Sequence, residues 1–198
     1  MPVPRGGTID PAMTRQRILE LSERIFYERG IGAVGIADIA REAGASKASI
    51  YKNFGSKEGL VEATLRYRSE RVHRWLTEGT AHLAPGRDRI LGMFDLLLDW
   101  YAQQDFRGCA MISAATEQRL ADSRLTDLAR QHLQTYREVL TSHLTAADVG
   151  EPGSLANRLL ILIEGATIVS AIDRDPAVGR DARAIAETLL SKALDQAR

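Results

Sequence analysis

Residues 36–60, IADIAREAGASKASIYKNFGSKEGL, decide the fold. Two short helical patterns meet in this stretch at Gly44. The first pattern has an apolar face at helical spacing, formed by Ile36, Ile39, Ala40 and Ala43. The second, which Ser46 caps and which runs to about Asn53, is too short and too polar to build a core. We therefore expect the second helix to lie on the surface and to contact something outside the chain.

Helical patterns also flank this stretch. Residues 10–30 begin with Asp10 as a plausible N-cap and Pro11 at the first helical position, and Gly30 ends the pattern. Ser56 caps a fourth helix that continues without a linker past residue 72. After a break at residues 84–88, helices are expected at residues 89–104, 108–120, 123–144, 154–172 and about 178–197. No alternating strand pattern occurs, so the sequence predicts an all-α fold.

The composition is that of an ordinary globular protein, and its charge is unevenly distributed. The 198 residues are 44% hydrophobic with a net charge of zero, but residues 1–72 carry 12 Lys and Arg against 9 Asp and Glu, whereas residues 73–198 carry 14 against 17. This basic excess favours a polyanionic partner at the N-terminal end.

A single cysteine excludes an internal disulfide, and residues 1–13 lack the apolar region of a secretory signal. The longest apolar run, residues 159–172, is short for a bilayer span, so we expect a cytoplasmic protein without a membrane partner.

The paired short helices have the length and spacing of a helix-turn-helix. In that motif the second helix enters the major groove of DNA, where Lys47 and Ser49 have side chains suited to base edges. Further along, Tyr51, Lys52 and Asn53 can donate to phosphates, and Lys57 lies at a helix N-terminus that also favours phosphate. A solvated polar helix with a few lysines would show the same spacing, so spacing alone leaves both interpretations open.

The residues at fixed offsets around this motif resemble the DNA-binding domain of the TetR family of bacterial transcriptional regulators. The resemblance covers about residues 17–60 and is carried by Phe26, Gly30, Ile39, Ala40, Ala43, Gly44, Ser46, Ile50, Tyr51, Phe54, Ser56, Lys57 and Leu60. It implies an N-terminal three-helix helix-turn-helix domain, expected at residues 10–55, and a helical ligand-binding and dimerisation domain at residues 56–198. It also implies base-reading positions at Lys47, Ala48, Ser49 and Lys52, and phosphate contacts at Tyr51 and Lys57.

Two positions depart from the family pattern. Gly35 stands where a Thr or Ser usually caps the second helix; glycine is a tolerable cap, but it lacks the hydroxyl. Asn53 occupies a position often held by His, and its amide can still donate to phosphate. These departures put single contacts in doubt and leave the family resemblance intact.

The C-terminal half offers candidates for an effector site. Mostly apolar side chains with a few polar groups are typical of such pockets, and the candidates are Met93, Leu97, Trp100, Cys109, Tyr136 and Glu164. Plain core packing explains most of them equally well, Glu164 can pair with an arginine, and Cys109 can be a small buried hydrophobe instead of a redox sensor. The four histidines have no close metal-ligand spacing and there is no nucleophile–base constellation, so we expect no metal, no cofactor and no enzyme.

The segment from Leu159 onward is apolar on every side and must be buried all round. A two-fold homodimer would cover one side of it, and the expected interface residues are Leu159, Leu162, Ile163, Ala166 and Leu189. A central helix inside a monomeric bundle is the alternative.

Together these features predict a dimeric DNA-binding regulator, a repressor that binds a palindromic double-stranded operator and is released by a small-molecule effector. An activator fits the same residues. The alternative from another class is a helical small-molecule-binding protein or enzyme with a vestigial helix-turn-helix, although such a protein would have no reason to keep Lys47, Tyr51, Lys52 and Lys57 together.

Overall fold

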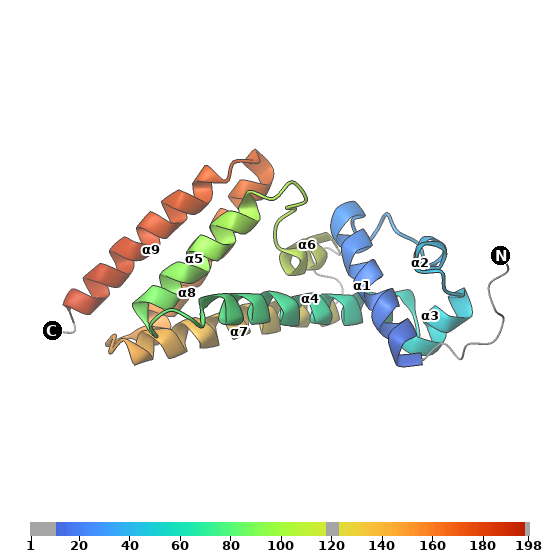
Figure 1. Cartoon of the computed structure of the whole chain (residues 1–198), viewed down its shortest axis with the longest axis horizontal. Helices are drawn as coiled ribbons and strands as arrows, with labels where there is room; N and C mark the ends of the chain where they lie inside the picture. The colour runs from blue at the N-terminus through green and yellow to red at the C-terminus, as the bar shows by residue number, and fades with distance from the viewer. Residues whose placement is uncertain (1–10, 118–122, 197–198) are drawn as a thin grey trace. The chain divides into compact units, whose positions relative to one another are not determined.

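The structure, a computed structural model, describes residues 11–117 and 123–196. Within these ranges it is all-α, with nine helices and no strand (Figure 1). The helices are α1 (Pro11–Arg29), α2 (Ile36–Ala43), α3 (Lys47–Phe54), α4 (Lys57–Thr80), α5 (Arg87–Tyr101), α6 (Ala110–Glu117), α7 (Ser123–Ala146), α8 (Pro152–Asp173) and α9 (Ala177–Asp195). The predicted fold class is confirmed, and α1 begins at Pro11 as expected; the proposed cap, Asp10, lies outside the described residues.

The chain divides into two compact units, residues 1–68 and 69–198. In the N-terminal unit, α1 packs against both α2 and α3, and α2 packs against α3. Its core is aliphatic, and the largest fully buried side chains there are Ile18, Ile25, Ile39, Ile50 and Leu60. Since three of these come from α2, α3 and the start of α4, the short helices are held by apolar contacts on one side while their other side remains available.

The first part of α4 belongs to the N-terminal unit. Arg68 of α4 forms an ion pair with the buried carboxylate of Glu23 in α1, and its guanidinium lies 3.7 Å from the centre of the Tyr27 ring. Tyr67 also donates to Glu20 at 3.4 Å. This compact unit therefore extends into α4 as far as Arg68, and the domain boundary after residue 55 expected from the sequence stays a prediction.

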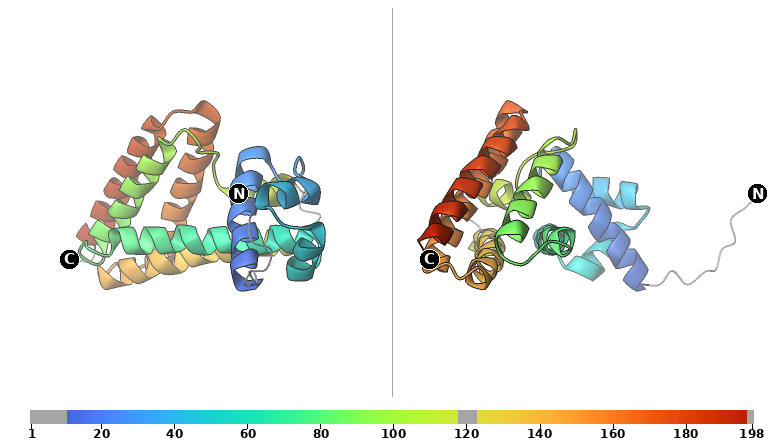
Figure 2. Two further views of the ribbon diagram at one scale, coloured as in Figure 1. Left: turned by 45° about the vertical axis from the view of Figure 1, so that its right-hand side comes forward. Right: turned by 60° about the vertical axis from the view of Figure 1, so that its left-hand side comes forward.

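The C-terminal unit is a helical bundle around one apolar core. Helices α5, α8 and α9 lie side by side, and α7 packs against α5, α6 and α8 (Figure 2). The second part of α4 joins this core through Leu76, which is 2% exposed. The core includes Ile90, Met93, Leu97, Leu140, Leu144 and Leu159, all of them fully buried.

Helix α8 is the one described helix that is long and apolar enough, by length and composition alone, to cross a membrane. It has 22 residues, more than the apolar run of the sequence suggested. It packs against α7 and α9 and contributes Leu155, Leu159 and Ile163 to the core, which is how the central helix of a helical bundle behaves.

Candidate nucleic-acid interface and effector region

The turn between α2 and α3 is set by two local caps. Gly44 ends α2 in the left-handed conformation, with φ of 58°, and donates to the carbonyls of Ala40 and Arg41. Ser46 then caps α3, because its hydroxyl accepts a hydrogen bond from the backbone N–H of Ser49 at 3.1 Å. Only glycine takes such a φ at little cost, so these two residues fix the angle at which α3 leaves the turn.

Helix α3 buries one face and exposes the other. Ile50 is fully buried against the core of the N-terminal unit, and the ring of Phe54 lies beneath the guanidinium of Arg15, 5.1 Å from its centre. Of the predicted DNA-contacting residues, Lys47, Ala48, Tyr51 and Lys52 are exposed and Ser49 is half-buried. Since α3, KASIYKNF, contains no acidic residue, every charge on its exposed face is positive.

Asn53 has a competing partner in the structure. Its side-chain amide nitrogen donates to the carbonyl of Ser49, one helical turn earlier, at 2.8 Å. An amide carries two N–H donors, so a phosphate contact would use the second donor or replace this bond. The predicted contact of Asn53 stays a prediction.

Lys57 begins α4 close to the end of α3. The hydroxyl of Ser56 accepts from the N–H of Gly59 at 3.0 Å, as expected of an N-cap. Helix α4 therefore begins beside α3. The positive end of its helix dipole and the half-buried Lys57 both lie at this start. Both features favour an anion at this end of the helix.

Gly59 is a functional position that sequence reasoning missed. A methyl group at Gly59 would lie 2.1 Å from the carbonyl oxygen of Phe54. The first turn of α4 thus approaches the end of α3 so closely that no side chain fits between them. The signal in the sequence is a glycine at the third position of a helix, where glycine is otherwise unfavourable.

The glycine at the start of α2 performs the role that the sequence predicted for it. Gly35 is the N-cap, in extended conformation. In place of a capping hydroxyl, the carboxylate of Asp38 accepts from the N–H of Gly35 at 3.2 Å and from Arg41 at 2.8 Å. These two hydrogen bonds lower the pKa of Asp38, and they order the start of α2 without a hydroxyl at position 35.

The six predicted effector residues all lie in the C-terminal unit. Met93, Leu97, Cys109 and Tyr136 are buried, whereas Trp100 and Glu164 are partly exposed. The structure brings Cys109, Tyr136 and Glu164 together: burial raises the pKa of Tyr136, and the nearby Glu164 and Cys109 raise it further. Met93 and Leu97 belong to the continuous apolar core, and Trp100 packs against it.

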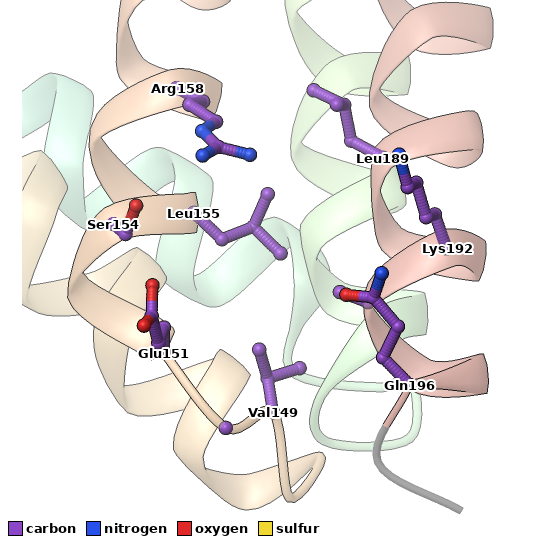
Figure 3. Close-up of a pocket in the computed structure, with 10 residues that line it drawn as sticks. Val149, Glu151, Ser154, Leu155, Arg158, Leu189, Lys192 and Gln196 are labelled. Atoms are coloured by element: carbon purple, nitrogen blue, oxygen red, sulfur yellow. The ribbon is translucent and has the colours of Figure 1, made fainter.

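A separate hollow opens between the start of α8 and the end of α9 (Figure 3). It has a volume of about 390 Å³, and Arg158 and Lys192 line it together with polar and apolar neighbours. None of the six predicted effector residues is among those that line it. We assign it no ligand.

The five predicted dimer residues differ in exposure, and their place at an interface stays a prediction. Leu159, Ile163 and Ala166 are 0%, 1% and 6% exposed, because they face the core of their own subunit. The exposed apolar side chains lie on the opposite side of α8, at Ile161, Ile168, Val169 and Ile172, and on α9 at Ile185. We name these five residues the α8 stripe. Leu162 and Leu189 are half-buried and can still reach a partner.

The sequence matches two families along most of its length. Residues 18–64 match the family described as "Bacterial regulatory proteins, tetR family", and residues 88–188 match "Transcriptional regulator LmrA/YxaF-like, C-terminal domain". The second match alone covers about half of the chain.

Individual relatives of known class match the N-terminal part of the chain. The chain is 46% identical over 52 residues to the HTH-type transcriptional regulator TtgR of Pseudomonas putida, and 43% identical over 56 residues to the HTH-type transcriptional repressor KstR2 of Mycolicibacterium smegmatis. These matches cover 26% and 28% of this chain, and the chain spans about a quarter of the length of either relative, 25% and 27%.

Among solved structures, SCO4454, a TetR-family transcriptional regulator from Streptomyces coelicolor, superposes with a TM-score of 0.83 at 25% identity, over 91% of this chain and 96% of that one. Both halves of the sequence and the fold as a whole thus agree with the motif around α2 and α3. The chain belongs to the TetR family of bacterial transcriptional regulators.

Proposed function

We propose that this protein is a DNA-binding transcriptional repressor that binds a palindromic operator as a homodimer and is released by a small-molecule effector. The observation that carries the proposal is the arrangement of α3. This helix has no acidic residue, packs on the core of the N-terminal unit through one buried face, and exposes Lys47, Tyr51 and Lys52 on the other face. One relative, KstR2, is named as a repressor, which supports repression over activation. In this proposal the protein is cytoplasmic and is not an enzyme.

The exposed residues divide between two tasks. Lys47, Ala48, Ser49 and Lys52 would read base edges in the major groove, because the early residues of a recognition helix lie closest to the bases. Tyr51 and Lys57 would bind phosphates on either side, and Asn53 would add a donor. The phosphate contacts position the helix and the base contacts select the sequence.

Dimerisation would use the α8 stripe. Ile161 and Ile172 are 65% and 74% exposed, and several large apolar side chains exposed along one helix favour an interface there. A two-fold axis would place two copies of α3 about 34 Å apart, in successive major grooves. The matching half-sites make the operator palindromic.

An effector would bind in the C-terminal unit, with Met93, Leu97, Trp100, Cys109, Tyr136 and Glu164 as its proposed contacts. It would favour a conformer in which the two α3 helices have the wrong separation. The effector can shift the equilibrium between the two conformers only by as much as its affinities for them differ, and this shift sets how far DNA binding weakens. Helix α4 contributes to both units, so a movement of its second part can reach the first.

The phosphate contacts give the first test. Fluorescence anisotropy with a labelled duplex from upstream of the gene measures affinity against salt. Lys57→Ala removes one cation, so we expect weaker binding to every sequence and a salt slope smaller by about one. Tyr51→Ala should also weaken binding, with little change in slope because tyrosine is uncharged.

The matched control is Lys192→Ala, which removes an exposed lysine of α9 in the C-terminal unit and should leave the salt slope unchanged. If neither Tyr51→Ala nor Lys57→Ala changed the affinity for the duplex, the phosphate assignment would be wrong.

A further inference from the structure

Three metal-ligating side chains meet in the C-terminal unit. Cys109 precedes α6, His132 lies in α7 and Glu164 in α8, and their ligand atoms all lie within 4.8 Å of one another. They are 23 and 32 residues apart along the chain, which is why no motif spacing revealed them. Cys109 and His132 are buried, at 9% and 4% exposed.

Glu164 has an incomplete hydrogen-bonding set. Its Oε2 atom is buried and has no hydrogen-bond partner among the residues that the structure describes. The carboxylate of Glu164 also accepts a hydrogen bond from the side chain of Cys109. An unpaired buried carboxylate oxygen is costly, and a bound cation would remove that cost.

His132 is oriented by neighbours on one side of its ring. Its Nδ1 atom lies 2.8 Å from the hydroxyl of Ser69 and 3.0 Å from Nε2 of His73. These two contacts fix the orientation of the imidazole ring beside Cys109 and Glu164. Metal-binding histidines are held in this way.

Gly108 keeps Cys109 close to α8. Its φ is 84°, and a methyl group there would lie 3.3 Å from the Cβ atom of Ala171 in α8. The segment before α6 therefore runs directly along α8, the helix that carries Glu164. Cys109 directly precedes the first residue of α6, Ala110.

We propose that Cys109, His132 and Glu164 form a binding site for one Zn²⁺ ion per chain. Thiolate, imidazole and carboxylate together match zinc, whereas Mg²⁺ and Ca²⁺ take oxygen ligands only. Tetrahedral zinc places its ligand atoms about 3.3–3.8 Å apart, so the separations of up to 4.8 Å seen here would shorten on binding. Binding displaces the thiol proton of Cys109 to solvent. The fourth position is left for water or another small ligand.

This site lies in the unit that would also hold the effector, and the inference rests on the side-chain cluster and not on DNA binding. The test therefore uses the protein alone. Failure to bind zinc would leave the proposed repressor function standing, and failure to bind DNA would leave the metal site standing.

The experiment uses the reduced, tag-free full chain and two readouts. Competition with a chromophoric chelator measures Zn²⁺ affinity and stoichiometry, and we expect one ion per chain. Co²⁺ serves as a spectroscopic substitute and should show tetrahedral d–d bands together with a thiolate-to-cobalt charge-transfer band.

Variants identify the ligands. Cys109→Ser should remove the charge-transfer band, and Cys109→Ser, His132→Gln and Glu164→Gln should each weaken Zn²⁺ binding at least about 100-fold, more than a change in the outer shell would. Ser69→Ala, which removes a partner of His132, should weaken it about 10-fold.

His82→Gln changes an exposed histidine outside the cluster and should leave the affinity unchanged. Circular dichroism checks the helical content of each variant. If His132→Gln or Glu164→Gln unfolds the C-terminal unit, Cys109→Ser, which exchanges one atom, still tests whether Cys109 binds the metal. The proposal is overturned if wild type binds Zn²⁺ no more tightly than Cys109→Ser, or if bound Co²⁺ shows no thiolate band.

Discussion

At the scale of single residues, Gly59 is the position with the least freedom. A methyl group there would meet the backbone carbonyl oxygen of Phe54 at 2.1 Å, so the backbone would have to shift. We expect Gly59→Ala to lower the free energy of unfolding by about 1–3 kcal/mol, as overpacking does, and to weaken DNA binding because α3 shifts. Thermal and denaturant unfolding measure the first effect.

Gly153→Ala is the matched control for Gly59→Ala. Gly153 is also in the first turn of a helix, α8, but a methyl group there meets nothing within 4 Å. The gain in helix propensity, up to about 1 kcal/mol, should make this change neutral or stabilising. Equal losses of stability in both variants would contradict the steric explanation.

A base-reading residue should differ from a phosphate-binding one in what it changes. Lys47→Ala removes an exposed side chain from the first turn of α3. We expect it to lower affinity for the preferred operator by about 1–3 kcal/mol and to relax the preference at one base pair. Binding to a panel of single-base operator variants measures this, and an equal loss on every duplex would assign Lys47 to phosphate instead.

At the scale of elements, α2 and α3 were predictable because their limits are local. Gly44, Ser46 and Ser56 act through their own backbone and nearest neighbours, and the structure gives the predicted end of α2, the cap of α3 and the start of α4. The TetR family pattern includes these same positions, so the family resemblance and the capping interactions indicate the same helix limits.

Helix α8 was not predictable in the same way. A helix that is apolar all round has no periodicity to show which side faces its own core, so Leu159 and Ile163 could not be distinguished from Ile161 and Ile168. The cluster of Cys109, His132 and Glu164 was hidden for a related reason, because the packing of three helices brings it together.

The α8 stripe gives a prediction for that element. Ile168→Glu with Ile172→Glu places two carboxylates on the proposed interface, and we expect the dimer to dissociate into folded monomers because burying them there would be costly. Sedimentation measures the mass and circular dichroism the helicity.

Met13→Glu, which changes an exposed apolar residue of α1, should leave the dimer intact. A dimer that survives both glutamates would place the interface elsewhere.

At the scale of the whole molecule, the two units have different constraints. The N-terminal unit carries its function on a short surface helix, and its matches to curated relatives reach 46% identity. The C-terminal unit also matches a known family, and the main structural feature of this unit is its shared apolar core. The DNA-binding residues were therefore predictable from the sequence, but the effector contacts were not, because they depend on how α5, α7, α8 and the segment before α6 pack together.

Selection of random DNA duplexes by the purified protein tests directly whether the chain recognises a palindromic operator through α3 and Lys57. Bound fragments are sequenced after several rounds, and the same is done with the variant carrying Tyr51→Ala and Lys57→Ala. The account predicts one enriched palindromic motif for the wild type, with half-sites centred about 10 base pairs or a multiple apart, and no enrichment for the variant. No enriched motif, or the same motif with equal enrichment for both proteins, would contradict it.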